Sequence, residues 1–240
     1  MQTVRGKSIL NQVVAGRLRF CQLAPPQPRP EPFGTPMEEE GRFYRALRQS
    51  VLDLAGLYDR MSRQVGAETA SIFAIHAMLL EDEDFVGEVC EAIGRDGTSA
   101  EYAVWKTGVR LAETFSVMDD RYMQARSGDI RDITHRVIWQ LRGERQADPL
   151  SRGPAILVSD EFLPGEVMEL DQSRLLGIVA RKGSVDSHTA LLMRACGVPS
   201  LAEVDLDEGW DGHLAILDGV RHQLCLDPDQ ETLDRLLPGG

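Results

Sequence analysis

A turn of small and polar residues leads into a helical segment at residues 182–194. These residues read Lys182-Gly183-Ser184-Val185-Asp186-Ser187-His188-Thr189-Ala190-Leu191-Leu192-Met193-Arg194. An apolar run at residues 175–180 precedes the turn. The helical piece spans residues 189–196 and ends where Gly197 and Pro199 follow. Strand, turn and helix in this order are typical of one unit of an α/β fold.

Other short apolar runs, of the length of buried strands, flank this unit. They are residues 155–158, 213–217 and 223–226, with an alternating run at 16–20 near the N-terminus. A bundle of helices offers no sheet edge, so we expect the N-terminal run to join the C-terminal sheet. The pattern therefore predicts an α/β domain built from two separate segments, residues 1–34 and 144–240.

The intervening residues, 35–143, carry helical signals. Thr35-Pro36-Met37-Glu38 forms a capping box, and an apolar stripe from Phe43 to Val65 follows at steps of three and four. A second capping box is expected at Thr98-Ser99-Ala100-Glu101. Six prolines between residues 25 and 36 indicate a linker before the first helix. We expect an inserted all-α bundle of helical hairpins.

Composition limits the functions open to the chain. Its 240 residues carry a formal net charge of −12, which argues against nucleic-acid and anionic-membrane surfaces and fits a basic partner. No apolar run reaches the ~20 residues of a membrane span, and no secretory leader opens the sequence. The four cysteines form no C-x-x-C, and the five histidines have no metal-ligand spacing. We expect a cytoplasmic protein without a metal ion in this chain.

His188 is the residue with the clearest potential for chemistry. It stands where a helix begins, and free N–H groups at a helix start bind anions such as phosphate. The positive end of the helix dipole also disfavours a protonated imidazole, which keeps such a ring nucleophilic. The residues leave two interpretations open. His188 carries a phosphoryl group, or it only caps the helix and satisfies a carbonyl.

The segment from Gly177 to Leu201 resembles the phosphohistidine motif of phosphoenolpyruvate-utilising enzymes. The shared residues are Gly183, Ser187-His188-Thr189-Ala190, Arg194 and Gly197-Val198-Pro199. A second group is similar to the helical insertion of enzyme I of the bacterial phosphoenolpyruvate–sugar phosphotransferase system. It comprises Ser71-Ile72-Phe73, His76, residues 78–83 and Asp129-Ile130-Arg131-Asp132-Ile133. The resemblance covers residues 6 to about 236.

The resemblance implies an α/β phosphohistidine (swivelling) domain interrupted by a helical subdomain that binds the carrier protein HPr. His188 would take a phosphoryl group on Nε2 and pass it to a histidine of HPr. The residues implied as catalytic are His188, Ser187 and Thr189, with Gly183, Ser184 and Asp186 in the phosphate loop. The residues implied for HPr binding are Glu68, His76, Met78, Leu79, Asp82 and Arg126. Glu81 to Asp84 are open to two interpretations, a solvated helix start or an acidic rim that steers HPr.

Three positions depart from the family pattern. Ser184 replaces a glycine, Asp186 replaces a threonine, and Leu163 aligns with a threonine that contacts the histidine in the family. A carboxylate two residues from a phosphohistidine is expected to repel it unless it points away or is hydrogen-bonded.

The family binds phosphoenolpyruvate and Mg²⁺ in a separate C-terminal barrel, for which this sequence has too few residues after the α/β domain. Alone, the chain is therefore expected to exchange phosphate with HPr and not with phosphoenolpyruvate. The alternatives are a non-catalytic HPr-binding module and a relay domain of a multi-domain phosphotransferase of the dihydroxyacetone kinase type. The swivelling domain of pyruvate phosphate dikinase is disfavoured by the long helical insertion.

Overall fold

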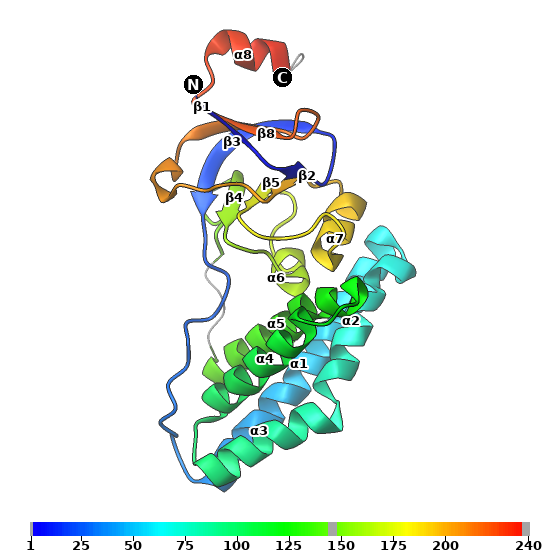
Figure 1. The fold of residues 1–240 in the computed structure, drawn as a ribbon, viewed down its shortest axis with the longest axis vertical. Helices are drawn as coiled ribbons and strands as arrows, with labels where there is room; N and C mark the ends of the chain where they lie inside the picture. Colours follow the sequence, from blue (N-terminus) through cyan, green and yellow to red (C-terminus); the bar gives the residue numbers. More distant parts are fainter. Residues whose placement is uncertain (1, 144–147, 237–240) are drawn as a thin grey trace. The chain divides into compact units, whose positions relative to one another are not determined.

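The computed structural model describes residues 2–143 and 148–236, and the chain forms two compact units. The α/β unit contains Met1–Leu23 and Ala147–Gly240, and the helical unit contains Ala24–Gln146. Figure 1 shows the strands and the short helices α6, α7 and α8 in the first unit, and the long helices α1 to α5 in the second. The helical unit thus interrupts the α/β unit in sequence, as expected.

The α/β unit is built on a mixed sheet whose strands lie in the order β1-β8-β7-β3-β4-β5-β6-β2. The strands are β1 (Gln2–Arg5), β2 (Lys7–Ser8), β3 (Val13–Phe20), β4 (Ala155–Ser159), β5 (Leu175–Ala180), β6 (Ser200–Ala202), β7 (Leu214–Asp218) and β8 (Gln223–Leu226). Strands β3, β4, β5 and β6 run parallel, and the other neighbours pair antiparallel.

Strand β3 links the two chain segments of this unit. It pairs with β4 on one side, where Leu18 lies opposite Ile156, and with β7 on the other. The prediction that the N-terminal strand joins the C-terminal sheet is therefore confirmed. The reason is burial, because Leu18 and Ile156 are both at most 1% exposed and would otherwise leave apolar surface in water.

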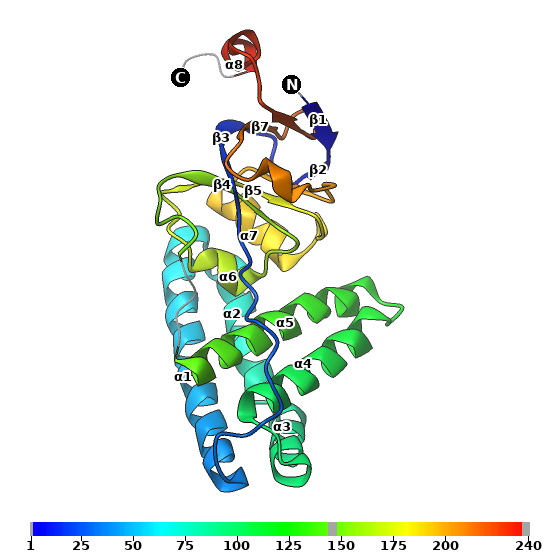
Figure 2. The same cartoon turned by 90° about the vertical axis from the view of Figure 1, so that its left-hand side faces the viewer.

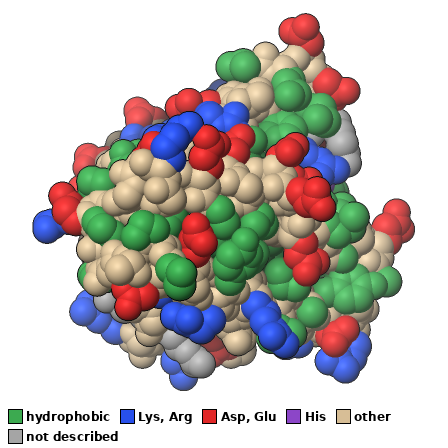
Figure 3. Space-filling view, turned by 90° about the horizontal axis from the view of Figure 1, so that it is seen from below, with side chains coloured by type: hydrophobic (Ala, Val, Ile, Leu, Met, Phe, Trp, Pro, Cys, Tyr) green, Lys and Arg blue, Asp and Glu red, His purple; other side chains and the backbone are tan. Residues whose placement is uncertain are grey.

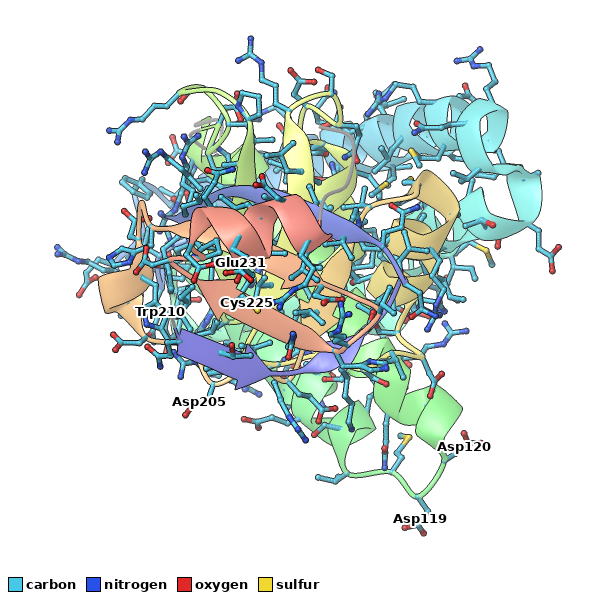
Figure 4. The ribbon with its side chains drawn as sticks, turned by 90° about the horizontal axis from the view of Figure 1, so that it is seen from above. Asp119, Asp120, Asp205, Trp210, Cys225 and Glu231 are labelled. Atoms are coloured by element: carbon cyan, nitrogen blue, oxygen red, sulfur yellow. The ribbon has the colours of Figure 1, made fainter. Side chains whose placement is uncertain are left out.

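Short helices of the described residues accompany the sheet. They are α6 (Pro164–Met168), α7 (His188–Cys196), α8 (Gln230–Leu236) and η1 (Glu208–Trp210). Trp210, labelled in Figure 4, is buried in a core cluster with β-strand residues such as Val158 and Leu217. The parallel strand order places the start of α7 after the carboxyl end of β5, which is where α/β sheets commonly present ligand sites.

The helical unit contains α1 (Pro36–Val65), α2 (Ala67–Leu80), α3 (Glu83–Asp96), α4 (Ala100–Ser116) and α5 (Arg121–Arg142). Helices α4 and α5 lie side by side as a hairpin, as Figure 2 shows, and α1 and α2 form another. Asp119 and Asp120 lie in the turn between α4 and α5 (Figure 4). The close approach of α4 to α5 requires Gly108, since a Cβ there would lie 2.1 Å from Thr134 Oγ1.

The helix starts follow local sequence signals with one exception. Thr35 caps α1 in a complete capping box with Glu38, as predicted. At α4 the predicted box is wrong, because Ser99 rather than Thr98 is the cap and accepts from Tyr102 N. Glu101 is drawn away from the cap by Arg42 of α1, with which it forms an ion pair.

The proline-rich segment packs on the helical unit. Ser99 N and Ser99 Oγ donate to the carbonyls of Pro30 and Arg29, at 2.8 and 2.7 Å. Buried Glu39 accepts from Phe33 N at 2.9 Å. These bonds explain why residues 24–34, which were expected in the α/β segment 1–34, lie in the compact helical unit.

The surface contains apolar side chains among charges of both signs. Figure 3 shows one such face, on which acidic and basic groups are interspersed with hydrophobic ones. No helix in the described part of the chain is long and apolar enough to cross a lipid bilayer.

Candidate functional site

His188 is the first residue of α7, and Ser187 is the residue that caps this helix. The Ser187 hydroxyl accepts from Ala190 N at 3.2 Å, while the Ser187 carbonyl accepts from Leu191 N at 3.0 Å. Ser187 has an extended backbone (φ −71°, ψ 158°), as a cap requires. The side chain of His188 is half-buried. His188 therefore lies at the positive end of a nine-residue helix, as the sequence predicted.

The two hydroxyls beside His188 have different roles. Ser187 Oγ uses a lone pair for the cap, so its proton can still be donated to an anion. Thr189 Oγ1 donates its only proton to the Phe162 carbonyl at 3.0 Å. In this conformation Thr189 cannot also donate its hydroxyl proton to a phosphate. The backbone N–H of Thr189 lies in the first turn of α7, where N–H groups have no acceptor within the helix.

Leu163 lies next to the carbonyl that Thr189 holds. Leu163 is buried at 4% exposure and precedes α6, and its N–H donates to Glu166 Oε2 at 3.3 Å. An aliphatic side chain donates no hydrogen bond to an imidazole. The hydrogen bond from Thr189 to the Phe162 carbonyl links the segment before α6 to the start of α7.

The loop before His188 is a tight turn. Gly183 has φ +127°, a conformation that L side chains rarely adopt, so glycine is required there. Ser187 N donates to the Ser184 carbonyl, and Asp186 N donates to Ser184 Oγ, each at 3.1 Å. Ser184, which replaces a family glycine, thus stabilises the turn by its hydroxyl. Asp186 is exposed to solvent.

His76 is placed differently from the sequence-based expectation. Its side chain is 0% exposed in the helical unit, so in this position it is not available to contact a partner. The ring lies between two buried carboxylates of α5, with Nε2 3.2 Å from Asp129 Oδ1 and Nδ1 3.2 Å from Asp132 Oδ2. Neither contact has the alignment of a good hydrogen bond, so we attribute the pairing mainly to opposite charge.

The electrostatics of His76 follow from this pair of carboxylates. Burial is the largest single influence and would lower the pKa of the imidazole. Asp129 and Asp132 together outweigh it and raise the pKa from 6.5 to about 9. The ring of Phe73 packs edge-on against the imidazole of His76, with 6.2 Å between the two ring centroids, and helps to exclude water. His76 is thus held as a cation between α2 and α5, a structural ion pair that the i, i+3 spacing of Asp129 and Asp132 could have indicated.

The other residues expected at the helical surface differ in exposure. Met78 is 71% exposed, and Glu68 and Asp82 are exposed as well. Leu79 and Arg126 are half-buried. Asp82 also has a structural role, because its carboxylate caps α3 by accepting from Asp84 N and Phe85 N at 2.9 and 3.3 Å.

Burial affects two of the four cysteines. Burial, with a smaller contribution from the charge of Glu166, raises the pKa of Cys21 to about 12, so its thiol stays protonated. Burial also raises the pKa of Cys196. Within residues 2–143 and 148–236, no group of three His, Cys, Asp or Glu side chains is arranged to hold a metal ion.

Comparison with known proteins agrees with this geometry. The family described as "PEP-utilising enzyme, N-terminal" matches residues 5–126, about half of the chain. "PEP-utilising enzyme, mobile domain" matches residues 152–222, which include the His188 turn. The chain belongs to the family of phosphoenolpyruvate-utilising enzymes.

Within that family, the fold is that of the N-terminal domain of enzyme I. The solution structure of Enzyme I (nEIt) aligns with a TM-score of 0.71 and 22% identity, covering 97% of this chain and 96% of that one. The structure of the N-terminal domain of Enzyme 1 - Nitrogen aligns with a TM-score of 0.65 and 27% identity, covering 97% of each chain.

Two curated relatives are much longer than the aligned region. The phosphoryl donor subunit DhaM of PEP-dependent dihydroxyacetone kinase from Pantoea ananatis is 33% identical over 79% of this chain and 40% of its own length. Phosphoenolpyruvate-protein phosphotransferase from Bacillus subtilis is 29% identical over 81% of this chain and 35% of its own length. The chain therefore spans well under half of these relatives.

Proposed function

We propose that this chain carries a phosphoryl group on His188 and exchanges it with the histidine of a small carrier protein of the HPr type. The observation that supports this most strongly is the position of His188 at the start of α7, beside the Ser187 cap. The test is labelling of the chain by phospho-HPr, with and without His188.

The proposed step exchanges one P–N bond for another. The lone pair of neutral His188 Nε2 attacks phosphorus of phospho-HPr, and the P–N bond to the HPr imidazole breaks in line with it. The leaving ring keeps the electron pair, and the proton displaced from His188 returns to solvent or to that ring. Such transfers pass through a loose transition state, so positioning and charge compensation are what the protein supplies.

We infer that three groups around the turn hold the transferred phosphoryl group. They are the hydroxyl proton of Ser187, the backbone N–H of Thr189 and the positive end of the α7 dipole. The hydroxyl of Thr189 is assigned a different task, because its proton is donated to Phe162. It holds α7 against the α6 region and so fixes the direction of His188.

We propose that phosphoenolpyruvate and Mg²⁺ bind to a separate domain, equivalent to the part of the longer relatives that does not align with this chain. This rests on the short span of those relatives that the chain covers, 40% and 35%. In this proposal the chain receives the phosphoryl group from that part and delivers it to HPr.

We propose the surface around Met78 on α2 as the docking site for HPr. An exposed methionine adapts to a partner, and Met is enriched at protein interfaces. The exposed acidic residues 81–84 lie directly after α2 and would attract a basic partner face. Glu68, Leu79 and Arg126 complete the proposed contact, whereas His76 supports it from inside the bundle.

Met78→Glu is expected to weaken binding of HPr by about tenfold or more, because a charge replaces an apolar contact at the centre of the proposed interface. Isothermal titration of HPr into the chain measures the effect. Met37→Glu is the matched control, since Met37 is 81% exposed on the same unit but lies on α1. Equal affinity for the Met78 and Met37 variants would remove the proposed docking site.

Asp186→Asn is expected to raise the rate of phosphoryl transfer from phospho-HPr about threefold to fivefold. A solvent-exposed charge near a dianionic group costs on the order of 1 kcal/mol, and this repulsion disappears in the variant. Stopped-flow or quench-flow labelling measures the rate, and the gain should shrink at high salt. Glu231→Gln, an exposed acid on α8, is the control, and a gain of the same size there would assign the effect to net charge alone.

A second candidate function is a relay within a phosphotransferase of the dihydroxyacetone kinase type, which the 33% identity to the DhaM subunit favours. The chemistry on His188 is the same, and only the carrier protein differs. Comparing initial rates with HPr and with the part of a DhaM protein that the alignment does not cover distinguishes them. Tight HPr binding without transfer would instead indicate a binding module.

A further inference from the structure

Arg194 lies in the last turn of α7 and connects two segments that are far apart in sequence. Its Nε donates to the Ile9 carbonyl at 3.1 Å, and its Nη2 donates to the Val185 carbonyl at 2.7 Å. Ile9 belongs to the connection between β2 and β3, whereas Val185 lies in the turn that leads to His188. One guanidinium therefore bridges the sheet and the histidine turn.

The Ile9 end of this bridge is firmly held. Ile9 N donates to the carbonyl of Ser200, the first residue of β6, at 2.9 Å. Ser200 is 1% exposed and its hydroxyl donates to the Val198 carbonyl. The guanidinium thus connects the turn to a segment that the buried sheet fixes.

Other hydrogen bonds act within the turn and at its two ends. Within it, Ser184 binds the N–H groups of Asp186 and Ser187, which sets the shape of the turn but not its direction. Lys182 N donates to the Asp160 carbonyl at 2.8 Å at the beginning of the turn. After His188, Thr189 Oγ1 donates to Phe162. His188 therefore lies between two anchored positions. Before it, the Val185 carbonyl is held by Arg194; after it, Thr189 is bound to the Phe162 carbonyl.

The geometry of the helix separates Arg194 from a direct role on the phosphoryl group. Two residues six positions apart on an α-helix emerge about 120° apart around the axis and about 9 Å apart along it. The guanidinium is, in addition, occupied by two carbonyls from two segments. To bind a phosphate with its Nε–Nη2 edge it would have to give up one or both of these bonds.

We propose that Arg194 is a positioning residue for phosphoryl transfer: by bridging the carbonyls of Ile9 and Val185 it holds residues 184–187 in the conformation that presents His188. This inference rests on the proposed function, because transfer is the activity that the position of the ring serves. The fork of N–H donors is what the role needs, since a lysine keeps the charge but cannot reproduce the bridge.

The test measures single-turnover transfer from phospho-HPr to the unaltered chain, Arg194→Lys and Arg194→Met. We expect both variants to lose about 10- to 100-fold in rate, as a small misplacement of a reacting group does. Their affinity for HPr should not change, and hydrogen exchange of the amides of residues 184–188 should become faster in both. The ¹⁵N shifts of the His188 ring report the tautomer and the hydrogen bonding of the imidazole, and they should change in both variants. Arg17→Lys and Arg17→Met are matched controls, because exposed Arg17 donates to the Gly212 carbonyl at 2.8 Å in the same unit.

The outcomes separate the two proposals. Transfer to the unaltered chain with wild-type rates in both Arg194 variants would overturn the positioning role alone. A wild-type rate in Arg194→Lys with a slow Arg194→Met would also overturn it and assign the residue to charge on the phosphoryl group. If the unaltered chain accepts no phosphoryl group, the proposed function fails and this inference fails with it.

Discussion

A chain with His188→Ala is expected to acquire no phosphoryl group from phospho-HPr, a loss of at least about 1,000-fold in covalent labelling. Removing the nucleophile of a covalent relay leaves no other group to accept the phosphorus, and mutational losses at nucleophiles are of this size or larger. In the unaltered chain the adduct should be acid-labile and stable to alkali, as a phosphoramidate is. The chain is labelled with ³²P from phospho-HPr, and the label that remains after acid and after alkali treatment is measured.

The control for this experiment is His213→Ala. His213 is a partly exposed histidine of the same unit, and its Nδ1 lies 2.9 Å from Asp227 Oδ2. This variant should label at the wild-type rate. Labelling that survives in His188→Ala, or that disappears in the His213 variant alone, would contradict the assignment of His188.

His76→Gln is expected to destabilise the helical unit by about 3–5 kcal/mol. The substitution removes the cation between Asp129 and Asp132 and leaves two buried carboxylates without it, which is the costly way to break a buried ion pair. Urea unfolding followed by the fluorescence of Trp105 and Trp139 measures the change, with Trp210→Phe in both proteins so that only helical-unit tryptophans report.

The same ion pair predicts a pH dependence of opposite sign to ordinary acid denaturation. The pKa of His76 is about 9 in the folded chain and 6.5 for an ordinary histidine, so the folded state holds an extra proton between these values. Stability should therefore be fully present below about pH 6.5 and fall as the pH rises through 9. The shift corresponds to about 3 kcal/mol, and the His76→Gln variant should lose this dependence.

His213→Gln is the control for the substitution itself: it changes a histidine beside an exposed aspartate in the α/β unit, so the signal of the helical-unit tryptophans should not change. Surface pairs of this kind contribute about 0–1 kcal/mol. If the His76 and His213 variants unfold at the same urea concentration, or if the unaltered helical unit is equally stable at pH 6.5 and pH 9.5, then His76 is not held as a buried cation.

Much of the architecture could be read from local patterns. The capping box at Thr35 and the alternation of strand and helix after residue 150 depend on neighbours a few positions apart, and the structure confirms both. The start of α7 beside Ser187 was accessible for the same reason. The failed capping box at Thr98 shows the limit of this approach, because Arg42, 59 positions from Glu101, decides where that carboxylate goes.

The amino-acid sequence by itself determined which segments are helices and strands and the place of His188 at a helix start, since periodicity and cap chemistry act over one or two turns. That the N-terminal strand joins the C-terminal sheet followed only because the helical insertion offers no sheet edge. Only the tertiary structure decided which polar groups meet: His76 with Asp129 and Asp132, Thr189 with Phe162, and Arg194 with Ile9, 185 positions away. A buried or bridging polar group takes whatever polar partner the packing brings into contact distance, and that choice depends on the whole fold rather than on neighbours in the chain.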